Sequence, residues 1–242
     1  GFYLATRLNL RDDLKLLVAK DDPLPGSHRH FSHLMAIHPL GSICWENGER
    51  DRAIIKGSLA DLDAQGTSQW CGYSFAWLAN LAARARDGEK AERALEVFSR
   101  AFCLRNGFHA NGDQSGQGYS NFRYRPFTLE GNFAAAAGLQ EMLLQSYSGT
   151  IRLFPAIPAG WREVSFRGLR AEGAFVVSAT RNGGRTEAVQ IVSEAGGVLR
   201  LENPFGEDGY RLTGAEPESV QAEGQDLLLE TRAGQTLTFS RK

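Results

Sequence analysis

The spacing of apolar residues changes once along this chain, near residue 150. Before that point apolar side chains return every three to four residues, as in residues 49–65, which is the spacing of an amphipathic helix. After it they alternate with polar residues, as at Val189 and Ile191, which is the spacing of a strand with one buried face. We therefore predict an α+β chain of two domains, helical over residues 1–149 and built of strands over residues 150–242.

The first domain is expected to hold about six helices. They cover approximately residues 11–20, 27–38, 49–65, 73–86, 89–104 and 129–145. In the second domain, Asn182-Gly183-Gly184 and Arg232-Ala233-Gly234-Gln235 are signals of hairpin turns. Short strands joined by such turns predict an antiparallel β-sandwich.

Glu130 opens the last predicted helix, just after Pro126. A carboxylate in the first turn of a helix faces the positive end of the helix dipole, which favours the negative charge. An ionised carboxylate in such a place suits a general base. The alternative is that Glu130 only caps the helix.

Four of the five histidines lie close together, and three of them are His28, His30 and His33. They could form a zinc site, although no acidic ligand is near in the sequence, or they could be core residues that bind backbone carbonyls. A third interpretation is the polar wall of a sugar or anion pocket, in which Arg29 and the imidazoles donate hydrogen bonds to hydroxyl groups. We favour this third interpretation, because several planar donors at one helix start are hard to explain by packing, and we expect no metal.

Aromatic and basic residues gather at other predicted helix starts and in the long loop of residues 105–127. Trp70 and Tyr73 precede or open one helix, and Arg123 lies shortly before Glu130. Aromatic faces beside hydrogen-bond donors and a carboxylate are typical of carbohydrate sites. A loop of about twenty residues inside a compact domain is also often functional.

Composition excludes some classes of partner. The net charge is −1 and there is no basic patch, so nucleic acid is not an expected partner. No apolar run approaches the roughly 18 residues of a membrane span. The three cysteines are too far apart to suggest a metal site or a disulfide framework, and no cofactor is expected. The chain begins without methionine, so we expect a piece of a longer protein or a processed one, and the compartment stays open.

Five blocks, in this order, carry a resemblance to a known family. They are His28-Arg29-His30-Phe31-Ser32-His33-Leu34, Cys71-Gly72-Tyr73-Ser74-Phe75-Ala76-Trp77, Leu129-Glu130-Gly131-Asn132-Phe133, Glu141-Met142-Leu143-Leu144-Gln145-Ser146 and Leu153-Phe154-Pro155-Ala156-Ile157-Pro158. Together they resemble glycoside hydrolase family 95, the α-L-fucosidase family, which also holds α-L-galactosidases. The resemblance implies the second half of an (α/α)6 barrel followed by a C-terminal β-domain, and hydrolysis with inversion.

The resemblance also implies roles for single residues. Arg29 and His30 match sugar-contacting residues of the family. Glu130 matches an aspartate that supports activation of the attacking water, and is one methylene longer. The family's general acid and water-holding asparagines lie upstream and have no counterpart here. With Glu130 as the catalytic residue, the expected substrate-binding residues are Arg29, His30, His33, Trp70, Arg123 and Asn132.

We therefore expect the C-terminal part of a glycoside hydrolase that acts on an α-L-fucoside or a related α-L-glycoside and is inactive alone. The alternatives are a non-catalytic carbohydrate-binding or structural fragment, and a phosphorylase of a related helical barrel. Half a barrel would expose apolar faces, for example around Leu78, Leu81 and Leu143, so the expected partner is the missing N-terminal half or a second copy. Analogy favours an extracellular or periplasmic location and leaves a cytoplasmic one open.

Overall fold

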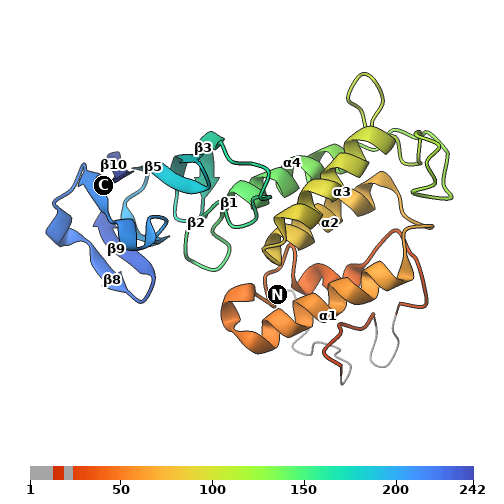
Figure 1. Cartoon of the computed structure of the whole chain (residues 1–242), viewed down its shortest axis with the longest axis horizontal. Helices are drawn as coiled ribbons and strands as arrows, with labels where there is room; N and C mark the ends of the chain where they lie inside the picture. The colour runs from red at the N-terminus through yellow and green to blue at the C-terminus, as the bar shows by residue number, and fades with distance from the viewer. Residues whose placement is uncertain (1–12, 19–23) are drawn as a thin grey trace. The chain divides into compact units, whose positions relative to one another are not determined.

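The computed structural model describes residues 13–18 and 24–242. The chain divides into two compact units, Gly1–Leu139 and Gln140–Lys242. Figure 1 shows helices in the first unit and strands in the second. The chain is therefore α+β, as predicted. Among the described residues, no helix has the length and the apolar character that crossing a membrane requires.

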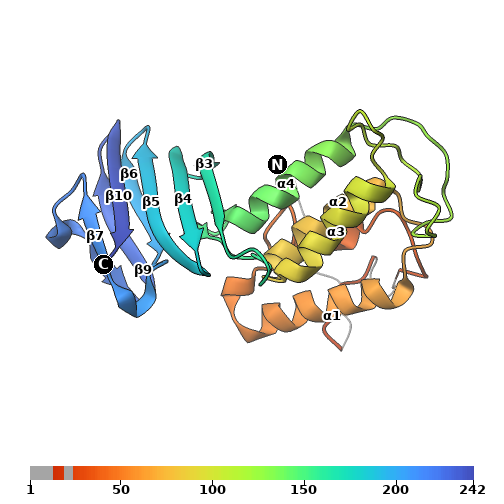
Figure 2. The ribbon, with the colours of Figure 1, turned by 45° about the horizontal axis from the view of Figure 1, so that its top comes forward.

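Four of the six expected helices are present as α-helices. They are α1 (Glu49–Gln65), α2 (Gly72–Arg84), α3 (Gly88–Ala101) and α4 (Glu130–Leu143), accompanied by the short 3-10 helices η1 (Ser32–Ala36) and η2 (Trp45–Asn47). The last four residues of α4 belong to the second unit. Figures 1 and 2 both show α2 and α3 side by side.

The helix expected over residues 27–38 is wrong except for the five residues of η1. Ser27 does not cap it, because its hydroxyl oxygen accepts a hydrogen bond from the distant backbone N–H of Gln69 (3.0 Å). The backbone N–H of His30 donates instead to Nδ1 of His28 (3.1 Å), and this local bond competes with helical pairing. The expected helix over 11–20 is absent from residues 13–18, and its remaining residues lie outside the described ranges.

The core of the first unit forms around α2, whose residues are buried on nearly every side. Aromatic rings pack across it, with centroids 5.0 Å apart for Phe31 and Trp77 and 5.2 Å apart for Phe75 and Phe102. Leu78 and Leu81 are 8% and 0% exposed, so the expectation that they lie on an open face is wrong. These side chains fill the space between the helices of the unit itself.

Small residues let α4 approach α2 closely. A β-carbon on Gly138 would lie 3.1 Å from that of Ala79. The side-chain amide of Asn80, buried in α2, donates to the carbonyl of Ala134 in α4 (2.8 Å). Because larger side chains would push the helices apart, packing explains the small residues of α4 at Ala134, Ala135 and Gly138.

The second unit consists of antiparallel sheets. The five-stranded sheet has the order β3-β4-β5-β10-β7, the three-stranded sheet has the order β6-β9-β8, and β1 pairs with β2. Their bounds are β1 (Leu144–Gln145), β2 (Arg152–Leu153), β3 (Val164–Ala171), β4 (Phe175–Asn182), β5 (Arg185–Ser193), β6 (Gly197–Glu202), β7 (Tyr210–Thr213), β8 (Gln221–Glu223), β9 (Asp226–Thr231) and β10 (Gln235–Arg241), with the 3-10 turns η3 (Gly206–Asp208) and η4 (Pro217–Ser219) between strands. Figure 2 shows the neighbouring strands of the larger sheet.

One hydrophobic core joins the two larger sheets. It contains Ile191 and Phe239 from the five-stranded sheet and Leu199 and Leu229 from the three-stranded sheet. Of the two predicted hairpin turns, the one after Asn182 joins the paired strands β4 and β5, with positive φ at both of its glycines. The turn after Thr231 joins β9 to β10, which belong to different sheets, so it is not a hairpin turn.

Candidate functional site

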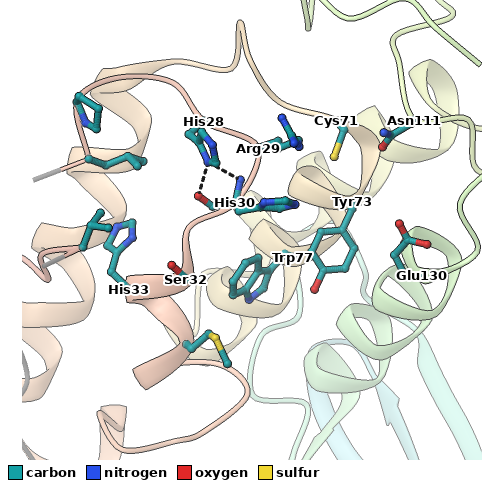
Figure 3. Close-up of a pocket in the computed structure, with 14 residues that line it drawn as sticks. His28, Arg29, His30, Ser32, His33, Cys71, Tyr73, Trp77, Asn111 and Glu130 are labelled. Atoms are coloured by element: carbon teal, nitrogen blue, oxygen red, sulfur yellow. Dashed lines mark hydrogen bonds between the residues drawn. The ribbon is translucent and has the colours of Figure 1, made fainter. Parts of the chain in front are cut away.

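A cavity of about 840 Å³ opens in the helical unit (Figure 3). Its wall comes from five parts of the chain: Val18, the segment of residues 24–35, residues 71–77 at the start of α2, the loop before α4, and the start of α4. The residues that line it are Val18, Leu24, Pro25, His28, Arg29, His30, Ser32, His33, Met35, Cys71, Tyr73, Trp77, Asn111 and Glu130. Most of the polar ones can donate hydrogen bonds, which suits a polyhydroxylated ligand.

The histidine side of the cavity combines the cationic side chain of Arg29 with several imidazoles. Burial lowers the pKa of His30 below its ordinary value, and the charges of Arg29 and His28 add to this effect. Burial lowers the pKa of His33 to about 4, against a small opposing effect of Asp61. A neutral imidazole carries one donor and one acceptor, so both rings can pair with a hydroxyl group near neutral pH.

Glu130 lies on the other side of the cavity. Figure 3 shows it on the side of Tyr73 and Asn111, across from His28 and His33. Glu130 is exposed and is the first residue of α4, where backbone N–H groups lack helical partners. Burial raises the pKa of Tyr73, and the negative charge of Glu130 adds to the increase. The Tyr73 hydroxyl therefore stays protonated and can donate a hydrogen bond beside the carboxylate.

The start of α2 ties the two sides together. Ser74 and Cys71 form a reciprocal cap, in which the Ser74 hydroxyl accepts from the backbone N–H of Cys71 (3.2 Å). The same hydroxyl donates to the backbone carbonyl of Arg29 (2.7 Å). The backbone of Arg29 is thus fixed to the helix that also presents Cys71 and Tyr73 to the cavity.

The structure brings Arg29, His30, His33 and Glu130 to one cavity. It does not bring the other three predicted residues there. Trp70 is 1% exposed and packs against Phe31 and Phe75 in the core. The side chain of Asn132 is hydrogen-bonded to backbone groups of the preceding loop, and Arg123 is exposed outside the cavity lining.

Sequence reasoning missed His109, Asn111 and Trp77. Asn111 and Trp77 line the cavity, and His109 is fully buried and contacts Thr128 and Gly131, close to Glu130 in the chain. His109 is the one histidine outside the cluster of four, in a loop without periodicity, and nothing local marks it as buried. As for metals, the residues that the structure describes contain no group of three or more His, Cys, Asp or Glu side chains arranged to hold an ion.

Two family models match this chain, and both belong to one family. The model of the glycosyl hydrolase family 95 catalytic domain matches residues 18–143, and the model of the glycoside hydrolase family 95 C-terminal domain matches residues 145–239. Alpha-L-fucosidase 2 of Arabidopsis thaliana is 33% identical over 154 residues, which are 62% of this chain and 17% of that protein. A family 39 glycoside hydrolase from Bacteroides cellulosilyticus WH2 aligns over 68% of this chain and 30% of its own, with 18% identity and a TM-score of 0.26.

Proposed function

The chain belongs to glycoside hydrolase family 95, and we propose that it supplies one side of a site that hydrolyses an α-L-fucoside or a related α-L-glycoside with inversion. The observation that carries this proposal is the cavity that places Glu130 across from Arg29 and the neutral side chains of His30 and His33. A carboxylate facing a wall of hydroxyl-binding groups suits a sugar bound with its anomeric carbon toward Glu130.

In this proposal Glu130 acts as the general base, or as the support of the base, for the attacking water. The water loses a proton toward the carboxylate as its oxygen bonds to the anomeric carbon, and the bond to the leaving-group oxygen breaks on the opposite face. The positive end of the α4 dipole favours the negative charge of Glu130. Arg29 and His30 hold sugar hydroxyls. Protonation of the leaving group needs an acid about 6.5–9.5 Å from the base, which we assign to residues upstream of this chain.

We further propose that the helices are the second half of an (α/α)6 barrel and that residues 150–242 form a β-sandwich domain. This chain spans 17% of the length of the Arabidopsis relative, so a large part of such a protein lies outside it. One face of α4 supports the barrel proposal: Leu129, Phe133 and Leu139 are 40%, 66% and 41% exposed. Leu129 directly precedes α4, and the exposed Ala136 lies between Phe133 and Leu139, so apolar side chains recur every three to four residues and form a stripe, which we propose the upstream half of the barrel covers.

The test compares this chain with the longer protein encoded together with its upstream sequence. Both are assayed on aryl α-L-fucoside and aryl α-L-galactoside, with and without inorganic phosphate, and the anomer released is followed by NMR. We expect turnover by the longer protein alone, independent of phosphate, with an inverted product. Phosphate-dependent release would identify a phosphorylase. Binding of the free sugar without turnover would identify a carbohydrate-binding protein, and either result overturns the proposal.

A further inference from the structure

We propose that His109 is the positioning residue that holds Glu130 at the cavity, a role that rests on the proposed function of Glu130. His109 is 0% exposed and is not among the residues that line the cavity. It lies in the loop between α3 and α4, twenty-one positions before Glu130. Its contacts fall on both sides of Glu130 and on the residue next to it.

The first set of contacts fixes the chain before Glu130. Nδ1 of His109 lies 2.6 Å from the backbone carbonyl oxygen of Thr128 and 2.8 Å from the Thr128 hydroxyl. A carbonyl oxygen can only accept, so Nδ1 carries the proton and donates it. The imidazole therefore holds the residue two positions before Glu130 by a side-chain hydrogen bond.

The second set fixes the chain after Glu130. The backbone N–H of His109 donates to the side-chain oxygen of Asn132 (3.0 Å), and the Asn132 amide donates to the carbonyl of Gly107 (2.8 Å). This pairing explains why Asn132 does not line the cavity: its amide clamps α4 to the loop. The first turn of α4 is thus held two positions before and two positions after the carboxylate.

The third contact is steric. A β-carbon on Gly131 would lie 2.3 Å from Nδ1 of His109, and one on Gly72 would lie 2.2 Å from Nε2. The ring therefore packs between the start of α4, which carries Glu130, and the start of α2, where Tyr73 follows Gly72. One side chain sets the spacing of the two helix starts that present polar groups to the cavity.

The buried ring also has a defined protonation state. Nε2 has no hydrogen-bond partner among the described residues, and it faces Gly72. Burial lowers the pKa of His109 below its ordinary value, although the Thr128 carbonyl and the charge of Glu130 act in the opposite direction. The geometry and the lowered pKa agree on a neutral ring with its proton on Nδ1, which serves as a fixed spacer and donor.

The expected consequence is a loss of catalytic rate when the donor is lost. A misplacement of a catalytic group by about 1 Å can cost on the order of 10²-fold in rate. Asparagine can place its amide N–H near the position of Nδ1, whereas glutamine reaches toward the position of Nε2. His109→Asn and His109→Gln are therefore a matched pair that differ in where the donor lies.

The experiment is carried out on the longer protein, with Arg105→Gln at an exposed position of the same loop as the control. The kcat and KM on the aryl glycoside are measured well below the melting temperature of every variant. Hydrogen exchange is measured for the amides of residues 128–133. We expect His109→Gln to lower kcat by about 10²-fold with KM little changed, and to speed exchange in that turn. In His109→Asn, kcat and the exchange rates of residues 128–133 should both stay close to those of the unchanged protein.

Two outcomes overturn the proposal. In one, both variants lose thermal stability but keep kcat and the exchange rates of residues 128–133. In the other, Asn and Gln are equally damaging, so that the position of the donor does not matter. If Glu130→Gln itself keeps full turnover, the proposed function fails. The exchange rates then still decide whether His109 holds this turn.

Discussion

A β-carbon at position 131 would lie 2.3 Å from Nδ1 of His109, so α4 and the loop before it fit together only because residue 131 is glycine. Real β-carbons do not approach other atoms so closely. The buried contact between the His109 ring and Gly131 therefore fixes the position of the adjacent residue, Glu130, whose exposed carboxylate lines the cavity.

This contact predicts that Gly131→Ala destabilises the protein. Glycine to alanine inside a helix normally stabilises by roughly 0.5–1 kcal/mol. Here the added methyl group would have to displace the imidazole, and overpacking of this kind costs about 1–3 kcal/mol. We expect a lower melting temperature, measured by calorimetry. Gly26→Ala is the control, because its β-carbon would meet nothing within 4 Å.

The same pair can be tested by a double-mutant cycle. His109→Ala removes the ring that the methyl group meets, so the two changes together should cost less than the sum of their separate costs. Simple additivity would show that the methyl group at position 131 is damaging for another reason.

Asp113 organises the long loop, and its removal should loosen it. Its carboxylate accepts from the backbone N–H of Ser115 (2.8 Å) and from that of Tyr119 (3.0 Å). Although burial alone would raise the pKa of Asp113, these bonds and the Ser115 hydroxyl hold it below its ordinary value. Leaving a buried donor unpaired costs about 1–3 kcal/mol, so Asp113→Ala should lower stability and expose residues 105–127 to protease.

Asp113→Asn is the matched variant for this loop. Asparagine keeps one acceptor oxygen but places its NH2 group against one of the backbone N–H donors, so we expect a loss of stability smaller than that of Asp113→Ala. If both variants resist protease as the unchanged protein does, the loop is held by other contacts.

Two half-buried histidines, His33 and His38, predict acid sensitivity. Burial lowers the pKa of His33 and of His38 to about 4 in each case, from an ordinary value of 6.5, and Arg84 contributes for His38. Between pH 6.5 and pH 4 these two histidines are protonated in the unfolded chain and neutral in the folded chain, so lowering the pH favours unfolding. Stability is thus complete above about pH 6.5 and falls as the pH falls toward 4.

The measurement is the melting temperature at a series of pH values. The decrease between pH 6.5 and 4 should be smaller in His33→Gln and His38→Gln, which have nothing to protonate. A decrease of equal size in both variants would mean that other groups cause the acid sensitivity.

The exposed stripe of α4 predicts association. Phe133, at 66% exposed, is its most open member. Phe133→Ser should increase the solubility of this chain alone and weaken its association with the separately produced upstream part, measured by analytical ultracentrifugation and calorimetry. Val198→Ser, at an apolar side chain 59% exposed in the other unit, should change neither. Unaltered association in Phe133→Ser would show that the stripe is not the contact surface.

Helices with a long apolar period were predictable from the sequence, but hydrogen bonds between distant parts of the chain were not. The helices over 49–65 and 129–145 appear as α1 and α4 within two residues at each end, because apolar periodicity directly reflects burial. The helix expected over 27–38 failed because Ser27 and His28 form bonds that compete with helical pairing. One of these bonds joins residues far apart in the sequence and the other involves a side chain, and the spacing of apolar residues predicts neither.

The candidate site was predictable in part for a related reason. Arg29, His30 and Glu130 stand beside recognisable helix starts and blocks, and they line the cavity. Trp70 shares the same local pattern but turns into the core, since a tryptophan beside a helix start can face either way. His109 was missed because its role comes from a close approach to two glycines, which no spacing in the sequence indicates.

The catalytic role of Glu130 is tested by the turnover of Glu130→Gln in the longer protein, with Glu130→Asp measured beside it. Glutamine keeps the shape and removes the charge, so kcat should fall by about 10²–10⁴-fold with KM little changed. Aspartate withdraws the carboxylate by one methylene, and a partial loss, up to about 10²-fold, is expected. If Glu130 only caps α4, glutamine should cost about 1 kcal/mol of stability or less and leave kcat near normal. Full turnover by Glu130→Gln would contradict the catalytic assignment.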